Sequence, residues 1–256
     1  MNLKRLVRPN KEFVTVLELL SPLAVYLAAT SGAEWYWWLT AFVFYFLYMV
    51  IGNHIAMHRY FCHGQFEVSR LTECLFVWTS AMSAMGSPIS WPVMHMHHHK
   101  HSDGPLDVHG PTVGFKTVLY YFYRNVEIDP AVFKSPRYKY LVERYWWVNK
   151  YYWYLVLANV GVLALLGWKV FLFVWFLPVT LTVSVIAISI YMQHWPKGSA
   201  TNDRYYSLIG LGESLHLNHH LKPGVSNTAF NPGEFDYMHW VAKLFATRFN
   251  NESDTH

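Results

Sequence analysis

The chain contains 256 residues, of which 53% are hydrophobic and 18% aromatic, but only 14% are charged. This composition differs strongly from that of ordinary soluble domains and indicates a membrane protein. The formal net charge of +4 and the lack of a basic stripe interleaved with aromatic residues argue against nucleic acid as a partner. Cys62 and Cys74 form no disulfide framework and no CxxC motif, so we expect both to be reduced thiols.

Apolar stretches in the chain are long enough to cross about 30 Å of hydrocarbon, for which about 20 residues are needed. The four candidate spans cover approximately residues 12–30, 35–53, 151–168 and 170–193. The turns 31–34 and 167–169 carry almost no positive charge, whereas Lys and Arg are frequent before the first span and in both long polar segments. This asymmetry places both termini and both polar segments in the cytoplasm.

The pattern predicts an all-α integral membrane fold with four transmembrane helices in two hairpins. A cytosolic helical cap, residues 54–150 and 194–256, would carry the polar chemistry. No repeat or flexible linker divides the chain, so we expect a single domain over residues 1–256.

The stretch 71–91 is apolar and nearly long enough to be a fifth span, although Glu73 and the Gly86-Ser87-Pro88 break weaken it. A crossing here would put the histidines at 58–63 and those at 95–99 on opposite sides of the bilayer. We therefore predict an in-plane or cap-buried helix. A continuous helix from Trp35 to His63 would extend beyond the hydrocarbon.

Thirteen of the 15 histidines lie in four groups along the chain. Two of these groups repeat an i, i+3, i+4 spacing, which projects imidazoles from one face of a helix. Neutral imidazole binds iron, zinc, copper or nickel, and eight or nine candidate ligands are too many for one ion. The sequence therefore predicts two metal ions. His54, His97 and His101 point off these faces and are not expected to be ligands, and the isolated His239 and His256 need no special role.

Three segments, His58-Arg59-Tyr60-Phe61-Cys62-His63, His95-Met96-His97-His98-His99 and His216-Leu217-Asn218-His219-His220, resemble the histidine boxes of the membrane fatty acid desaturases. The resemblance is to the acyl-CoA and acyl-lipid delta-9 type, and it extends from about residue 12 to 240. It implies two iron ions bound by His58, His63, His95, His98, His99, His194, His216, His219 and His220.

The same resemblance implies residues that support these ligands. In general, the second ring nitrogen of a ligand histidine must also be held, and a carboxylate usually does this. The supporting residues are Asp103, Asp107, His109 and Glu213. The resemblance also places Trp91 next to the bend of an acyl tunnel.

The implied function is an O2-dependent fatty acyl desaturase that forms a cis double bond near the ninth carbon of a saturated acyl chain. The substrate would be a fatty acyl lipid, an acyl-CoA or an acyl carrier, and electrons would come from a separate cytochrome b5 or ferredoxin, because the chain stops soon after the last box. Residues that could form a basic docking face for that donor are Lys100, Arg137, Lys139, Arg144, Lys197, Arg204 and Lys222.

The sequence departs from the family pattern at three places. Ile190 stands where the family often has an Asn that holds a metal-bound water, and Met96 replaces a common Arg. Residues 92–94, Pro-Val-Met, replace polar residues that hold the CoA headgroup in acyl-CoA members. This last departure favours a lipid-bound or carrier-bound acyl chain.

Two alternative functions stay open at this point. A hydroxylase would use the same metals and differ only in the fate of the substrate radical. A metal transporter would place polar ligands near the middle of the bilayer, whereas these spans are almost free of ionisable groups. Proteolysis is not supported, because HExxH and GxSxG motifs are absent from the sequence.

Overall fold

The computed structural model describes residues 11–107, 127–194, 199–202 and 213–250. The described chain is mostly helical, and two of its helices are long and apolar enough to cross a membrane. The first comprises α4 (Trp35–Phe46) and η1 (Leu47–Cys62), which is wound as a π-helix. The second runs from Trp168 to Gln193.

The second long helix contains three segments: α10 (Trp168–Val170), the π-helix η4 (Phe171–Phe176) and α11 (Leu177–Gln193). Pro178 lies inside this continuous helix, and the Val174 carbonyl, four residues earlier, accepts a hydrogen bond of 3.0 Å from the Tyr48 hydroxyl in place of the N–H that the proline lacks. The helix therefore continues through Pro178 to the histidine at its end, although the proline lies inside an apolar run.

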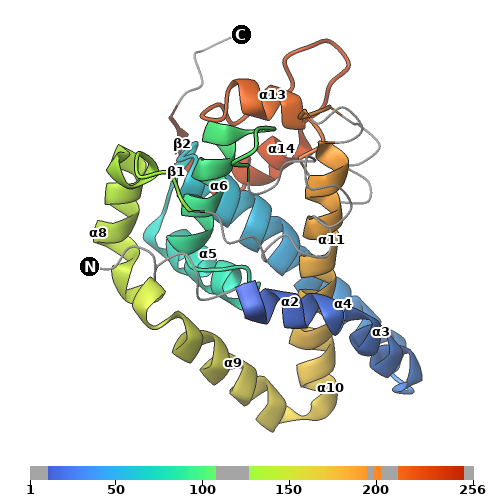
Figure 1. Ribbon diagram of the computed structural model, residues 1–256. Helices are drawn as coiled ribbons and strands as arrows, with labels where there is room; N and C mark the ends of the chain where they lie inside the picture. Colours follow the sequence, from blue (N-terminus) through green and yellow to red (C-terminus); the bar gives the residue numbers. More distant parts are fainter. Residues whose placement is uncertain (1–10, 108–126, 195–198, 203–212, 251–256) are drawn as a thin grey trace.

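The other two predicted spans differ from simple crossing helices. Helices α2 (Lys11–Leu19) and α3 (Ser21–Thr30) are bent by 46° at Leu20, so they form at most one broken span. Helix α9 (Tyr152–Leu166) is apolar but has only 15 residues. In Figure 1, α3, α9 and α10 lie in the lower part of the molecule, and α11 rises from α10 towards the top.

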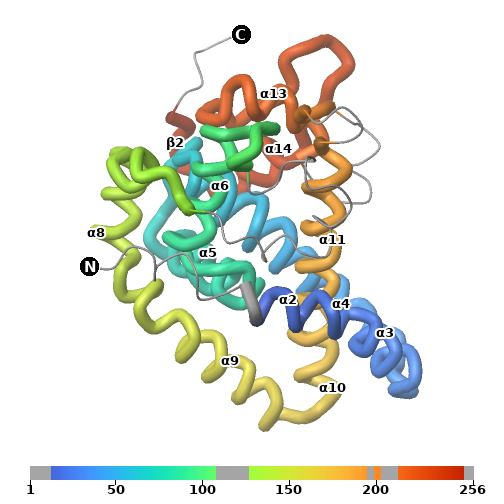
Figure 2. The backbone as a smooth tube through the Cα atoms, viewed as in Figure 1, coloured from blue at the N-terminus to red at the C-terminus, as the bar shows by residue number. Residues whose placement is uncertain are grey.

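Residues 71–91 do not form one continuous helix. Helix α5 (Arg70–Met82) ends in a turn, in which Ala84 and Gly86 have φ values of 60° and 138°. Helix α6 (Ser90–His101) then begins, where the Ser87 hydroxyl accepts hydrogen bonds from the backbone N–H groups of Ile89 and Ser90. Both helices pack against η1, as the tube in Figure 2 shows, so the single helix predicted for this stretch is two helices joined by a turn.

The polar segments add short elements to this bundle. They are η3 (Val132–Lys134), α8 (Pro136–Lys150), α13 (His216–Leu221) and α14 (Tyr237–Lys243). Strands β1 (Phe66–Val68) and β2 (Ala246–Phe249) pair antiparallel, with Phe66 opposite Phe249. The prediction of a purely helical chain missed this pairing, because each strand is only three or four residues long and its partner is distant in the sequence.

Two apolar cores hold the fold together. One core lies among the apolar helices and includes Tyr48, Met82 and Phe173. The other lies between η1, α5, α8 and α14 and includes Phe61, Phe76 and Leu141. Helix η1 contributes to both cores, because almost all of its side chains are buried. It therefore fixes the position of the histidines at its own end relative to the rest of the molecule.

Candidate metal centre

The nine histidines that the sequence singled out as ligands converge in the fold. One group contains His58, His63, His95, His99 and His219, and a second contains His98, His194, His216 and His220. Within each group the candidate ligand atoms all lie within 4.8 Å of one another. In Figure 1 the elements that carry them, α6, α13 and the ends of η1 and α11, meet at the end of the molecule opposite α10.

Local structure explains how each element presents its histidines. On α6, His95 and His99 are one turn apart, and their Nε2 atoms are 3.0 Å apart. On α13, His216 and His220 show the same spacing and the same 3.0 Å separation. The π-helix η1 brings His63 to His58 by a backbone hydrogen bond of 3.1 Å from the N–H of His63 to the carbonyl of His58.

Nitrogen–nitrogen distances test whether these groups fit a metal ion. Pairs of Nε2 atoms from different elements lie 2.9 Å apart for His58 and His219, 3.0 Å for His194 and His216, and 3.2 Å for His98 and His220. Metal–nitrogen bonds of about 2.1 Å at right angles give about 3.0 Å, whereas a tetrahedron gives about 3.4 Å. The nitrogens of each pair are therefore close enough to bind one ion, and the five imidazoles of the first group exceed the four ligands of a structural zinc site.

Carboxylates hold three of these imidazoles from behind. The Nδ1–H groups of His58, His98 and His194 donate to Glu213, Asp107 and Asp103 at 3.2, 2.7 and 2.8 Å. Each Nε2 then keeps its lone pair and directs it into the group. Among the described residues, the buried Nε2 of His63 has no hydrogen-bond partner, as expected for an atom placed to bind a metal.

Two of these carboxylate residues have an uncommon backbone conformation. Asp103 and Glu213 have φ values of 63° and 55°, in the left-handed region. Such conformations cost free energy and cluster at functional sites, where the surrounding structure enforces them. The fourth predicted supporting residue, His109, lies outside the described residues.

The environment favours the neutral form of several of these imidazoles. Burial, together with repulsion between neighbouring histidines, holds the pKa values of His95, His98, His216 and His219 well below the usual value for histidine. Burial and the nearby His194 lower the pKa of His220 to about 4. Burial opposes the charge of Glu213, but Arg59 and His58 outweigh this effect and keep its pKa well below its usual range. Neutral imidazoles backed by ionised carboxylates are the form that binds metal cations.

Comparison with known proteins agrees with this geometry. Residues 8–231 match the sequence profile of the fatty acid desaturase family, which is most of the chain. The chain belongs to the fatty acid desaturase family. The family that the three histidine boxes indicated is therefore confirmed.

Curated relatives of this desaturase-family chain act on different acyl groups, according to their names. An icosanoyl-CoA 5-desaturase of Limnanthes douglasii is 27% identical over 76% of this chain and 59% of its own length. An sn-2 palmitoyl-lipid 9-desaturase of Nostoc is 27% identical over 79% of this chain and 76% of its own length. A chloroplastic palmitoyl-monogalactosyldiacylglycerol delta-7 desaturase of Arabidopsis thaliana is 24% identical over 82% of this chain and 59% of its own length. The matched region thus spans about six-tenths of two of these relatives.

A narrow pocket of about 50 Å³ lies beside the histidines of this desaturase-family chain. Its walls include Trp91, Ile186 and Ile190 together with metal-group histidines from η1, α6, α11 and α13. The indole of Trp91 stacks on the His95 imidazole, with 4.8 Å between ring centroids. Apolar side chains therefore lie directly beside the candidate metal centre.

Sequence reasoning missed the residues that hold Glu213 in place. Arg59 is only 1% exposed, and its Nε donates to Glu213 at 2.8 Å. The same guanidinium donates to Asp236 at 3.0 Å and to the backbone carbonyl of Ser226. A usable signal was present, because an ionisable residue near the end of an apolar helix marks a candidate functional site.

The histidines that were not expected to be ligands lie outside both groups. The Nε2 of His97 is 2.9 Å from the carbonyl of Leu106, and its Nδ1 accepts the backbone N–H of Asp129. His101 contacts the Asp129 carboxylate at 2.9 Å. His54 lines the narrow pocket, His239 contacts Ser226, and His256 lies outside the described residues.

The predicted basic face is only partly open. Lys100 pairs with Asp129 at 2.9 Å, Arg144 pairs with Glu73 at 2.7 Å, and Arg137 donates to backbone carbonyls of Tyr60 and Phe61. Lys139 and Lys222 are exposed, whereas Lys197 and Arg204 lie outside the described residues. Several of these cations therefore contribute to holding the fold.

Proposed function

We propose that this chain is an O2-dependent fatty acyl desaturase that uses two iron ions to form a cis double bond in a saturated acyl chain, near the ninth carbon. The observation that carries the proposal is the convergence of nine histidines in two groups beside a narrow apolar pocket. Family membership supports the reaction class. The preference for iron rests on the resemblance of the histidine boxes to those of the membrane fatty acid desaturases, and the five-imidazole group argues against a four-coordinate zinc site.

The chain's own side chains position and shield the reacting groups. Iron, when bound, supplies the oxidising power that breaking an unactivated C–H bond requires. Glu213, Asp107 and Asp103 orient three of the nine proposed ligands through their Nδ1 atoms. Trp91, Ile186 and Ile190 exclude water and hold methylene groups against the histidines, so that position decides which carbons react.

The acyl carrier is proposed to be a lipid or a carrier protein rather than free CoA. Pro92, Val93 and Met94 offer no charged groups for a CoA headgroup. The relatives described above are named for both CoA-bound and lipid-bound acyl groups, so the proposal rests on these three residues. The relatives are named for different double-bond positions, so the ninth-carbon assignment rests on the resemblance of the boxes alone.

The proposed membrane topology is a single domain with four crossings in two hairpins, and both termini in the cytoplasm. The crossings would be α2–α3, α4–η1, α9 and α10–α11. An ion pair of 3.2 Å between Lys169 and Glu34 supports this arrangement, because it joins the turns of the two hairpins. The turns would then lie together on the membrane face opposite the histidines.

Electrons are proposed to arrive from a separate ferredoxin or cytochrome b5. Lys139 and Lys222 are exposed cations on the proposed cytoplasmic side that an acidic donor could contact. No fused donor domain is required by this proposal.

Gas chromatography of lipids from cells that express the protein tests the activity. We expect a new cis-monoene with the unaltered chain and none with His98→Ala, because His98 belongs to the second histidine group. His101→Ala is the matched control, since His101 lies on the same helix but outside both groups, and it should retain the product. A hydroxy fatty acid in place of the monoene would favour the hydroxylase.

Metal analysis of the purified protein tests the cofactor separately. We expect about two iron atoms per chain for the unaltered protein and for His101→Ala, with fewer for His98→Ala. Stoichiometric binding of a single zinc ion would contradict the proposed centre.

A further inference from the structure

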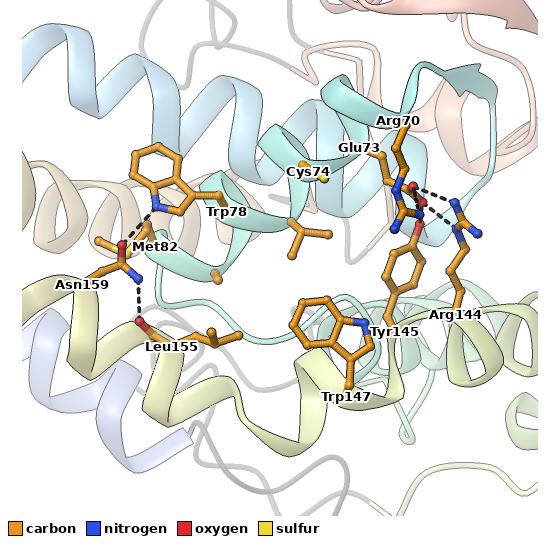
Figure 3. A pocket seen from close by; sticks show the side chains of 12 residues that line it. Arg70, Glu73, Cys74, Trp78, Met82, Arg144, Tyr145, Trp147, Leu155 and Asn159 are labelled. Atoms are coloured by element: carbon orange, nitrogen blue, oxygen red, sulfur yellow. Dashed lines mark hydrogen bonds and ion pairs between the residues drawn. The ribbon is translucent and has the colours of Figure 1, made fainter.

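A second pocket, of about 220 Å³, lies between α5 on one side and α8 and α9 on the other (Figure 3). None of its lining residues lines the narrow pocket beside the histidines. Helix α5 separates the α5–α9 pocket from η1, and the contact is close, since a Cβ on Gly52 would lie 2.8 Å from the Thr79 carbonyl oxygen. The α5–α9 pocket is therefore distinct from the candidate metal centre.

One end of the α5–α9 pocket is charged. The Glu73 carboxylate accepts two hydrogen bonds of 2.7 Å from Arg144, another from Arg70 at 3.2 Å, and one from the Tyr145 hydroxyl. Burial opposes its ionisation, but the hydrogen bonds from Arg144 and Tyr145 prevail and lower the pKa of Glu73. Two guanidinium groups facing one carboxylate leave a net positive charge at this end.

The exposure of these groups shows where the charge is directed. The Glu73 side chain is 7% exposed, whereas those of Arg70 and Arg144 are 77% and 42% exposed. The carboxylate is thus enclosed, and the guanidinium groups present their remaining N–H donors to the outside. An anion at the mouth of the pocket would meet a positive surface.

The other end of the pocket is apolar. Trp78, Met82 and Leu155 form its walls, and Figure 3 shows Trp147 opposite α5. The Asn159 carbonyl oxygen accepts from the Trp78 indole at 3.3 Å, and its amide donates to the Leu155 carbonyl. These polar atoms contact one another, so the pocket offers mainly carbon surface to an occupant.

The position of the pocket along the chain matches the boundary of a membrane. Helix α8 is polar and ends at Lys150, and the apolar α9 follows directly. Trp147 and Tyr151 at this junction are 55% and 45% exposed, as is typical of aromatic residues at a membrane–water interface. The charged end lies on the α8 side of the junction, and the apolar end lies along α9.

We propose that the α5–α9 pocket binds one anionic membrane phospholipid, with its phosphate at Arg70 and Arg144 and one acyl chain between α5 and α9. The positive mouth complements the phosphate, and the carbon-lined interior complements the chain. This lipid is a bound neighbour of the enzyme and not its substrate, because α5 separates it from the histidines.

Cys74 provides a reporter on the unaltered protein. It lines the pocket and is exposed, whereas Cys62, the second described cysteine, is buried. The full chain in a nonionic detergent would be treated with a maleimide. Peptide mass spectrometry would measure the alkylation of each cysteine over time. We expect phosphatidylglycerol to slow alkylation of Cys74 at a lower mole fraction than phosphatidylcholine does, and soluble glycerol phosphate to have no effect.

A matched pair of variants tests the proposed headgroup contact. Arg70→Gln should require roughly fivefold more phosphatidylglycerol for the same protection, the factor expected from losing one basic residue near an anionic headgroup. Arg248→Gln removes an equally exposed arginine on β2, which pairs with Glu67, and should leave the protection unchanged. Native mass spectrometry should show one phospholipid per chain, with lower occupancy in Arg70→Gln.

Two outcomes would overturn the proposal. One is equal protection by phosphatidylglycerol and phosphatidylcholine, with no difference between the two arginine variants. The other is protection that depends on protein concentration but not on lipid, which would assign the pocket to a second copy of the chain.

Discussion

Arg59 shows how a single side chain couples distant parts of the site. It lies in the first histidine box, and its guanidinium joins two carboxylates, Glu213 and Asp236. Asp236 in turn accepts the backbone N–H of Thr228 and that of His239 at the start of α14. A buried arginine is stable in this setting because both carboxylates neutralise it. The chain of contacts ends at His58, whose Nδ1 faces Glu213.

We predict that Asp236→Asn lowers both stability and metal content. The substitution keeps the side-chain shape, and Arg59 keeps its contact with Glu213, so losing the charged hydrogen bonds to Asp236 should cost about 1.5–3 kcal/mol. Glu213 would then move with Arg59 and release His58. Thermal unfolding and iron per chain would be measured beside Glu67→Gln, which breaks the exposed pair with Arg248. Equal iron content in both variants would show that Asp236 does not support the site.

Local spacing explains which residues could be predicted. Histidines three or four positions apart share a helix face whatever the fold, so the second and third boxes were identified from the sequence. Arg59 and Asp236 are 177 positions apart, and no local pattern relates them. Their contact depends on how α14 packs against η1, which periodicity does not report.

At the scale of elements, the π-winding of η1 gives a reason for the spacing of the first box. In an α-helix, residues five positions apart point about 140° away from each other. A π-helix joins i and i+5 by its hydrogen bond, and so places them one turn apart. The His58 and His63 ring centroids are 4.8 Å apart as a result. The long helix was predicted, but its π-winding was not, because apolar content alone does not distinguish the two helix types.

Close packing of η1 against α5 leads to a second prediction. A Cβ on Gly52 would lie 2.8 Å from the Thr79 carbonyl oxygen, so Gly52→Ala must push the two helices apart. We expect a loss of about 1–3 kcal/mol, as for other overpacked cores. Gly161→Ala on α9 is the control, because a Cβ there meets nothing within 4 Å. Thermal unfolding in detergent should separate the two variants, and identical midpoints would contradict this packing.

At the scale of the whole molecule, the polar chemistry is segregated from the apolar helices. The metal groups lie at one end, and the Glu34–Lys169 pair joins the hairpin turns at the other (Figure 1). Composition and basic-residue asymmetry predicted this separation. They did not predict that α2–α3 bends by 46° or that α9 has only 15 residues, because both depend on how these helices pack.

The proposed topology predicts that the two ends of the molecule face opposite sides of the membrane. Cysteines would be introduced as Glu34→Cys and Arg248→Cys into a Cys74→Ala background, since both positions are exposed and Cys62 is buried. A membrane-impermeant maleimide should label position 34 in intact spheroplasts and position 248 only after permeabilisation. Labelling of both positions from the same side would exclude the four-crossing arrangement.

The lowered pKa values of the buried histidines predict that the stability of the metal-free fold depends on pH. The pKa values of His95, His98, His216 and His219 are well below the ordinary value of about 6.5, and that of His220 is about 4. As the pH falls below about 6.5, the unfolded chain binds protons that the folded chain does not. Each such histidine then removes about 1.4 kcal/mol of stability per pH unit.

The stability of the metal-free fold should therefore decrease as the pH falls from about 6.5 towards 4. Together the five histidines would remove about 10 kcal/mol between pH 6.5 and pH 5, so we expect the unfolding temperature of chelator-treated protein in detergent to fall by roughly 20 °C or more between pH 7 and pH 5. Iron-loaded protein should resist this change until protons displace the metal, because bound cations keep the imidazoles neutral. If the unfolding temperature of the metal-free protein stays constant over this range, the buried imidazoles do not have lowered pKa values. The environment described for the proposed centre would then be wrong.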